Sequence, residues 1–412
     1  MTTRPSFRSA LTLTVLVGAL GYFVDIFDLL LFPIVKTPSL VALGVPSAQL
    51  LSVGARLLAW QMNGMLAGGI LWGVLGDKRG RLSVLFGSIA LYSLANIANA
   101  FVTSVPMYEA LRFIAGLGLA GELGAAITLV SETLPKETRG YGSSIVAGVG
   151  ITGAVVAAAV GKLFTWKVAY LVGGGLGLAL LALRVGIAES GMFQQARSQE
   201  VSRGNFLLLF TGRDRFLRFL RCILVGLPVW FVVGILVVNA ESFAPALGVH
   251  GKVENGFAVA CCYAGGALGD MAAGAVSQML HSRRRAIAGY LTLSLAAITA
   301  FLLLRGLSAT AFYGLCALLG FSFGYWALII TVASEQFGTN LRATVTTTVP
   351  NFIRGSLTPM TWVFLALNTR FGILPAAAAL GAGILLLAFL SLRGMEESFG
   401  RDLDFLEAHT EL

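Results

Sequence analysis

The stretch LTLTVLVGALGYFVDIFDLLLFPIV, residues 11–35, decides the fold class of this chain. It is apolar enough and long enough to cross a hydrocarbon core of about 30 Å as one helix. It nevertheless contains two acids, Asp25 and Asp28, and each costs roughly 2.5–3.5 kcal/mol to place at the centre of a membrane helix. Ionisable residues inside membrane spans usually face a cavity or a partner charge. This run therefore predicts a membrane helix whose acids face a cavity or a partner charge.

Similar apolar runs recur along the whole chain of 412 residues, of which 57% are hydrophobic and only 12% are charged. A soluble domain carries about 25% charged residues, so the composition predicts an all-helical membrane protein. The first run is too long for a signal peptide and lacks a cleavage site. The twelve predicted spans are residues 10–34, 48–75, 82–103, 106–131, 141–162, 167–187, 217–239, 254–280, 286–304, 309–333, 344–367 and 373–393.

The longest polar interruption, residues 189–215, divides these spans into two sets of six. Segments of the two sets resemble each other in the same order: VGALGYFV (17–24) matches VGLPVWFV (225–232), and SETLPKETRG (131–140) matches SEQFGTNLRA (334–343). Parallel repeats of six helices build one large transporter architecture. The predicted organisation is a six-helix bundle over 1–188, a cytoplasmic linker over 189–215, a second six-helix bundle over 216–395 and a cytoplasmic tail over 396–412.

The net charge of +9 reflects membrane topology rather than a nucleic-acid footprint. With the N-terminus inside, most Lys and Arg residues, Arg184 and Arg283 among them, are assigned to the cytoplasmic side, whereas Lys36 and a few others fall on the opposite side. An excess of Lys and Arg marks the cytoplasmic side of a membrane protein. We expect an integral protein of a bacterial inner membrane, with both termini in the cytoplasm and no nucleic-acid partner.

The loop after the second span, GVLGDKRGR (73–81), carries a family motif. It resembles a loop of the major facilitator superfamily in which Gly, Asp, a basic residue, Gly and Arg stand at fixed spacing, although Leu82 replaces the second basic residue at its end. RFIAGLGLAGELGAAITLVSETLPKETRG (112–140) resembles the fourth helix and following loop of the sugar and metabolite–proton symporters in that superfamily. The resemblance implies twelve helices in two pseudo-symmetric bundles and transport by alternating access.

The resemblance also implies that charges at the cytoplasmic helix ends pair with one another and hold the outward-open state. The alternative is that they are solvated loop charges, and exposed ion pairs contribute little. Because the spacing recurs in both halves, a gate is favoured. Its candidate residues are Gly73, Asp77, Lys78, Gly80, Arg81, Glu132, Arg139, Glu335 and Arg342.

Three acids within the spans are candidates for proton coupling. Asp25 and Asp28 stand where metabolite–proton symporters and organic-acid carriers place two acids, and residues three apart share one helix face. Two carboxylates this close disfavour both being ionised, so one of them can hold a proton. A structural pairing with Arg112 is the alternative. The resemblance implies that Glu122 is a second carboxyl on the proton route. The alternative is that Glu122 only forms a structural hydrogen bond with a neighbouring backbone group.

Four further residues are candidates for substrate binding. Arg354 is a fixed cation near mid-membrane, and its forked donors suit a carboxylate or a phosphate of a substrate. Equally, Arg354 could neutralise an internal acid such as Asp270. Asn351 lies three residues before it on the same face. By resemblance, Arg112 modulates the charge of the acids or contacts the substrate. Asp270 either pairs with Arg354 or adds a coupling carboxylate.

The predicted function is proton-coupled symport of a small polar metabolite, an organic anion or a zwitterion, by a monomer surrounded by membrane lipid. A proton-driven exporter of an amphipathic compound is one alternative, although SSIVAGVGITGAVVAAAVG (143–161) lacks the Gly-Pro motif of the antiporters. A non-transporting receptor or scaffold with the same fold is another. An enzyme, a cofactor and a metal site are not expected. AGLGLAGELG (115–124) contains a nucleotide-type glycine pattern, but it lies in a membrane helix with no preceding strand.

Overall fold

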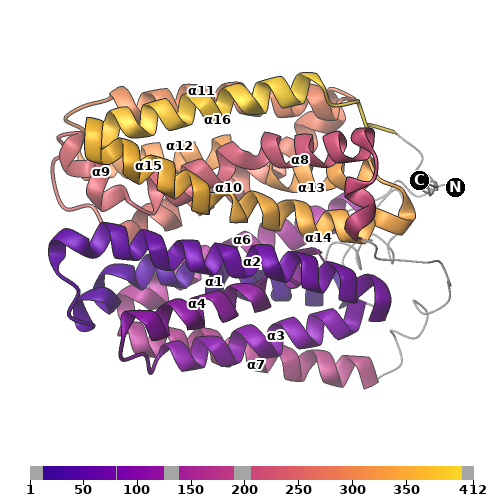
Figure 1. Ribbon diagram of the computed structural model, residues 1–412, viewed down its shortest axis with the longest axis horizontal. Coiled ribbons are helices and arrows are strands. Elements are labelled where there is room, and N and C mark those ends of the chain that lie inside the picture. The colour runs from indigo at the N-terminus through magenta and orange to yellow at the C-terminus, as the bar shows by residue number, and fades with distance from the viewer. Residues whose placement is uncertain (1–12, 80, 125–138, 190–205, 401–412) are drawn as a thin grey trace, which may run out of the picture.

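The chain folds into long helices laid side by side, as the computed structural model of the protein shows (Figure 1). The structure describes residues 13–79, 81–124, 139–189 and 206–400. Within these ranges the backbone is helical apart from turns and a single isolated bridge. Helices satisfy their own backbone hydrogen bonds, which is what a lipid environment requires.

The helices follow the predicted spans. Their bounds are α1 Leu13–Ala42, α2 Leu50–Arg79, α3 Arg81–Asn99, α4 Val105–Leu119, α6 Arg139–Leu163, α7 Trp166–Glu189, α8 Arg213–Phe231, α9 Ala240–Ala246, α10 Asn255–Met279, α11 Arg283–Leu303, α12 Ala309–Ser322, α13 Trp326–Glu335, α14 Thr339–Gly355, α15 Leu357–Phe371 and α16 Ile373–Arg393. Short segments join some of them: η2 Ser47–Gln49, η4 Phe206–Phe210 and the π-helical η5 Val232–Val237. Within the described ranges, seven helical stretches are long and apolar enough to cross a membrane.

Two layers make up the bundle (Figure 1). Helices α1 to α7 form the first layer and α8 to α16 form the second. The layers meet along a seam where α2 packs on α14 and α6 packs on α10. α1 begins and α16 ends at the same end of the bundle, which we call the terminal end. The seam helix α14 has the polar sequence TNLRATVTTTVPNFIRG, which suits a helix that faces protein rather than lipid.

Several predicted spans are interrupted rather than continuous. The span predicted over 217–239 passes from α8 into η5 and then α9, just beyond Pro228, whose missing N–H weakens the helix. The spans predicted over 309–333 and 344–367 break between α12 and α13 and between α14 and α15. Residues stay apolar through most of these breaks, so hydrophobicity alone did not reveal them.

The predicted linker and tail are described only in part. Residues 190–205 and 401–412 lie outside the described ranges. The end of the linker forms η4, and α8 already begins at Arg213. η4 packs on the second layer through Phe206, whose ring lies 6.0 Å from that of Phe352 in α14.

α10 and α12 approach each other backbone to backbone. A side chain at Gly320 would meet the carbonyl oxygen of Cys262, and one at Gly265 would meet that of Ala317. Small residues at such contacts allow membrane helices to pack closely. Cys262 is buried at this contact.

Candidate functional site

Asp25 of α1 and Arg354 of α14 face each other across the seam. The distance from Asp25 Oδ2 to Arg354 Nη2 is 4.0 Å, and both side chains are buried. Neither carboxylate oxygen of Asp25 has a hydrogen-bond partner among the described residues. Charge therefore holds this pair, without a direct hydrogen bond. The partner of Arg354 is an acid of the first layer, not Asp270 of its own layer.

Asn351 orients Arg354 from one helical turn away. Its Oδ1 accepts a hydrogen bond of 3.3 Å from Arg354 Nη1. Its Nδ2 donates to the carbonyl oxygens of Ala120, at 2.9 Å, and Thr347, at 2.8 Å. Ala120 belongs to the first layer, where α4 ends, so Asn351 connects the guanidinium to the opposite side of the seam. Gly69 of α2 makes room for this contact, since a side chain there would meet Asn351.

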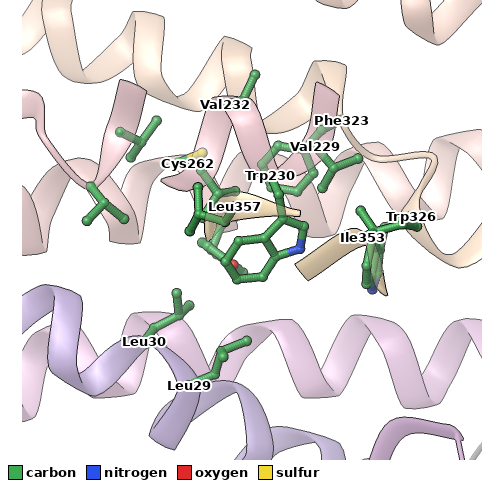
Figure 2. Packing of buried hydrophobic residues seen from close by; sticks show 14 of the residues in the cluster. Leu29, Leu30, Val229, Trp230, Val232, Cys262, Phe323, Trp326, Ile353 and Leu357 are labelled. Atoms are coloured by element: carbon green, nitrogen blue, oxygen red, sulfur yellow. The ribbon is translucent and has the colours of Figure 1, made fainter. Parts of the chain in front are cut away.

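Aromatic side chains surround the pair. The Arg354 Cζ lies 5.6 Å from the centre of the Trp326 ring, and the buried Tyr22 lies within electrostatic reach of both charges. Figure 2 shows the Trp230 indole projecting from the second layer toward Leu29 and Leu30 of α1. A cation with aromatic walls thus occupies the middle of the seam.

Asp270 of α10 is not within ion-pair distance of Arg354. Its Oδ1 accepts the backbone N–H of Ala327 at 3.0 Å, at the beginning of α13. A carboxylate at a helix N-terminus satisfies exposed N–H groups and matches the positive end of the helix dipole. Asp270 therefore holds the break between α12 and α13 beside the site. Among the described residues, no group of three or more His, Cys, Asp or Glu side chains is placed to hold a metal ion.

Asp28 and Arg112 belong to a second polar cluster, inside the first layer. Arg112 of α4 donates to Asn96 Oδ1 at 2.8 Å, and its Cζ lies 5.1 Å from the centre of the Tyr170 ring. The Arg112 charge acts on Asp28, yet neither oxygen of Asp28 has a hydrogen-bond partner among the described residues. Asp25 and Asp28 were expected to share one cavity. The two acids lie one turn apart and their charges act on each other, but the cation that acts on Asp25 is Arg354 and the cation that acts on Asp28 is Arg112.

Arg184, which the sequence assigns to the cytoplasmic side, is buried inside the first layer. Its guanidinium forms a two-point pair with Glu122, Nη2 to Oε1 at 2.5 Å and Nη1 to Oε2 at 3.0 Å. Nη2 also donates to the Val17 carbonyl at 3.2 Å, and Gly21 of α1 leaves space for the pair. The sequence missed this contact because Arg184 stands close to the end of its predicted span, where an Arg normally reaches solvent. Its partner is distant in the chain.

The described gate candidates make contacts at the terminal end. Glu335 pairs with Arg283 at 3.0 Å and accepts the Ser398 hydroxyl at 2.7 Å. Arg342 donates to the Ser334 carbonyl at 3.1 Å. Glu335 therefore pairs with the end of another helix, and both members of the pair belong to the second layer.

The other gate candidates are described less fully. Gly73 of α2 lies opposite Thr344 and Thr348 of α14, so a close contact of small residues forms this part of the seam. Gly80 and Glu132 lie outside the described residues. For the remaining four only the backbone is described: Asp77 and Lys78 in the last turn of α2, Arg81 at the start of α3 and Arg139 at the start of α6.

Lys36 crosses the seam at the end opposite the terminal end. Its Nζ donates to the carbonyl oxygen of Val238 and to Oδ1 of Asn239, both at 3.1 Å. The next residue, Thr37, donates to Glu241 Oε2 at 3.3 Å. The seam is therefore closed on both sides of the pair formed by Asp25 and Arg354.

Comparison with known proteins identifies the family that has this architecture. A family model described as Major Facilitator Superfamily matches residues 11–357. The niacin transporter NiaP of Acinetobacter baylyi is 28% identical over 320 residues, which are 68% of this chain and 70% of that protein. The 4-hydroxybenzoate transporter PcaK of Pseudomonas aeruginosa is 34% identical over 145 residues, which are 34% of this chain and 32% of that protein.

A solved structure shows the same fold. The crystal structure of a D-xylose-proton symporter matches with a TM-score of 0.67, covering 97% of this chain and 100% of that chain at 16% sequence identity. At this identity the likeness shows the fold alone. The relatives and the fold are those of transporters and not of enzymes.

Proposed function

Since this chain belongs to the Major Facilitator Superfamily of membrane transporters, we propose that it carries a small aromatic carboxylate together with a proton by alternating access. One observation carries the proposal: a buried acid of the first layer, Asp25, faces a buried cation of the second layer, Arg354, with no hydrogen bond between them. The relatives named for niacin and for 4-hydroxybenzoate supply the substrate class, because both compounds are single aromatic rings that bear a carboxylate.

Protonation of Asp25 couples the proton to the substrate. When Asp25 is ionised, it neutralises Arg354 and competes with any other anion for the guanidinium. When Asp25 is protonated, Arg354 is left without a counter-charge in a low-dielectric site, where an unpaired cation is costly. A substrate carboxylate restores the balance, and the planar fork of Arg354 can hold it with two hydrogen bonds. Proton and anion therefore favour each other's binding and move together.

The aromatic walls suit the rest of the substrate. Trp326 and Tyr22 lie beside the guanidinium, and Trp230 projects into the same seam (Figure 2). Aromatic rings prefer offset-stacked or edge-to-face contacts with such walls, which stabilise a flat ring by about 0.5–1.5 kcal/mol beyond its burial. Asn351 holds the guanidinium in place during binding.

The position of the pair at the seam links binding to movement. Bundles over 1–188 and 216–395, joined by the linker over 189–215, rock about the site, so that the contacts of Lys36 and those of Asn351 open in turn. The Arg-rich terminal end lies in the cytoplasm of a bacterial cell, and the protein works as a monomer in the inner membrane. Asp28, near Arg112, serves as a second protonatable group within the first bundle.

Uptake by vesicles containing the purified protein tests this function. We expect labelled nicotinate or 4-hydroxybenzoate to accumulate when the outside is more acidic than the inside. Asp25→Asn should still exchange substrate but should no longer accumulate it, because Asn mimics the protonated acid permanently. Arg354→Gln should lose transport. Arg56→Gln is the matched control, since Arg56 is 58% exposed and pairs with Glu109 of its own layer.

Three outcomes would contradict the proposal. Accumulation by Asp25→Asn equal to that of the wild type would remove Asp25 from the coupling. Proton-driven extrusion of amphipathic compounds, with no effect of aromatic acids, would favour an exporter. Absence of counterflow with every acid tested, together with tolerance of changes at Arg354, would favour a receptor or scaffold.

A further inference from the structure

Lys36 is a buried ammonium whose hydrogen bonds go to neutral acceptors, and the charge of the nearby Glu241 carboxylate also acts on it. The side chain is 5% exposed, and its two partners are the carbonyl oxygen of Val238 and the amide oxygen of Asn239. An ammonium has three N–H donors, so one donor remains beyond these two bonds. A carboxylate adds a full opposite charge to such a hydrogen bond, which a neutral carbonyl or amide oxygen does not, and this attraction is stronger at a buried site than in water. An incoming anion would therefore displace the present partners.

The acceptors of Lys36 lie where a helix is broken. η5 ends at Val237, and α9 begins at Ala240, so Val238 and Asn239 stand between the two segments. The Asn239 Nδ2 is itself bonded to the carbonyl of Ile235 at 2.9 Å. The Asn239 amide is thus fixed to its own layer and does not follow Lys36 when the layers separate.

A cavity adjoins the ammonium and is walled by both layers. Gly54 and Leu58 of α2 line one side, and Gly234 of η5 and Phe364 of α15 line the other. The stem of Lys36 packs directly on Gly54, where any side chain would displace it. With the seam closed this space is large enough for about one water molecule, so its apolar walls can take up an aromatic ring only after the layers separate.

This cavity is separate from the site at Arg354. Lys36 is eleven residues beyond Asp25 in α1. At 1.5 Å per residue the separation along the helix is about 16 Å, too far for a single-ring acid to contact both cations at once. Leu29 and Leu30 lie between the two positions along α1, and the Trp230 indole of α8 projects toward them (Figure 2).

We propose that Lys36 is an outer docking point for the substrate carboxylate, and that the arriving anion opens the seam by replacing Val238 and Asn239 as acceptors of the ammonium. The inference rests on the proposed function for the identity of the anion. The closure by Lys36 does not depend on it. The substrate thereby opens the path to Arg354 only when it carries the charge that the transporter selects.

The first test asks whether Lys36 holds the seam closed, and it is done in the absence of any aromatic acid. In a protein whose four native cysteines are replaced by Ala, Leu58→Cys is labelled by a membrane-impermeant thiol reagent added outside. Lys36→Gln removes the charge and should speed labelling about tenfold, while Lys36→Arg keeps N–H donors and should stay nearer the wild-type rate. Lys252→Gln is the control, because Lys252 is 85% exposed at the same end. An unchanged rate in Lys36→Gln overturns the closure.

The docking of the anion is tested by transport from each side. Lys36→Gln should raise the KM for nicotinate entering from the outside about tenfold and leave the KM for efflux unchanged. An equal KM for entry in Lys36→Gln and the wild type overturns the docking point. If the wild type transports no aromatic acid at all, the proposed function fails, whereas the labelling result still decides whether Lys36 closes the seam.

Discussion

The Asn351 Nδ2 of α14 donates a hydrogen bond of 2.9 Å to the Ala120 carbonyl of α4, across the seam between the two layers. The Oδ1 of the same amide accepts from Arg354 Nη1 at 3.3 Å. One side chain thus connects the proposed anion site with a contact that closes the terminal side of the seam. A guanidinium that turns toward a substrate carboxylate must change or release this amide. Occupancy of the site and closure of the seam are therefore linked through Asn351.

We expect Asn351→Ala to slow nicotinate uptake about tenfold and leave the protein folded. A hydrogen bond of this kind contributes about 1–1.5 kcal/mol, and its loss weakens both the orientation of Arg354 and the closed seam. Initial uptake rates and thermal unfolding in detergent measure the two effects. Asn368→Ala, at a partly exposed position near the end of α15, is the control. Wild-type uptake by Asn351→Ala would show that the amide has no part in the cycle.

The pair formed by Glu122 and Arg184 should be more important for stability than for coupling. Removing one partner leaves a buried charge without compensation, at a cost of about 3–5 kcal/mol. We expect Glu122→Gln and Arg184→Gln each to lower the Tm in detergent by many degrees. The double variant, which buries no unpaired charge, should melt closer to the wild type.

The double variant also separates the two roles considered for Glu122. If the residue only fastens α1, α4 and α7, a folded double variant should still accumulate substrate along a proton gradient. Loss of that accumulation with substrate exchange preserved would instead place Glu122 on the proton route. Unaltered melting of both single variants would show that the pair contributes nothing to stability.

The contact of α10 and α12 gives a matched pair of glycine substitutions. Gly320→Ala puts a methyl group onto the Cys262 carbonyl, whereas nothing lies near the corresponding position at Gly314 in the same helix. Overpacking of this kind costs about 1–3 kcal/mol. We expect a lower Tm for Gly320→Ala and an unchanged or slightly higher Tm for Gly314→Ala. Equal Tm values for the two variants would mean that the helices can move apart at no cost.

The terminal end of the second layer should be sensitive to acid. Glu397 accepts the Ser282 hydroxyl and the backbone N–H groups of Arg283, Phe399 and Arg284. Although partial burial opposes the charge, these hydrogen bonds lower the pKa of Glu397 from its ordinary value of 4.5. The stabilisation is therefore fully present above about pH 4.5 and is lost as the pH falls through the lower folded pKa. Tm should consequently decline with acid more steeply in the wild type than in Glu397→Gln, and parallel curves would refute this role.

Much of the fold followed from local sequence. Twelve apolar spans could be recognised because lipid requires about 20 apolar residues for each crossing. The span predicted over 373–393 coincides with α16, and GVLGDKRGR identified the family that the comparisons confirm. The helix breaks could not be predicted, because a helix interrupted inside protein can keep the same apolar composition.

The sequence indicated which charged residues belong to the candidate site, but not how they pair. Asp25, Asp28, Glu122, Arg112 and Arg354 stood out because charge is rare in an apolar span. Which acid faces which cation was beyond the sequence. Helical periodicity places Asp25 and Asp28 on one face, but it does not say which helix lies opposite each.

The amino-acid sequence by itself determined the membrane class, the order of the helices and the charged residues that such a protein retains, since these depend on composition and spacing along one chain. Only the tertiary structure decided that Asp25 faces Arg354, that Arg184 is buried against Glu122 and that Lys36 closes the seam. Each of these contacts joins segments distant in the chain. The distances between the paired side chains depend on how the helices pack, and no local sequence pattern encodes this packing.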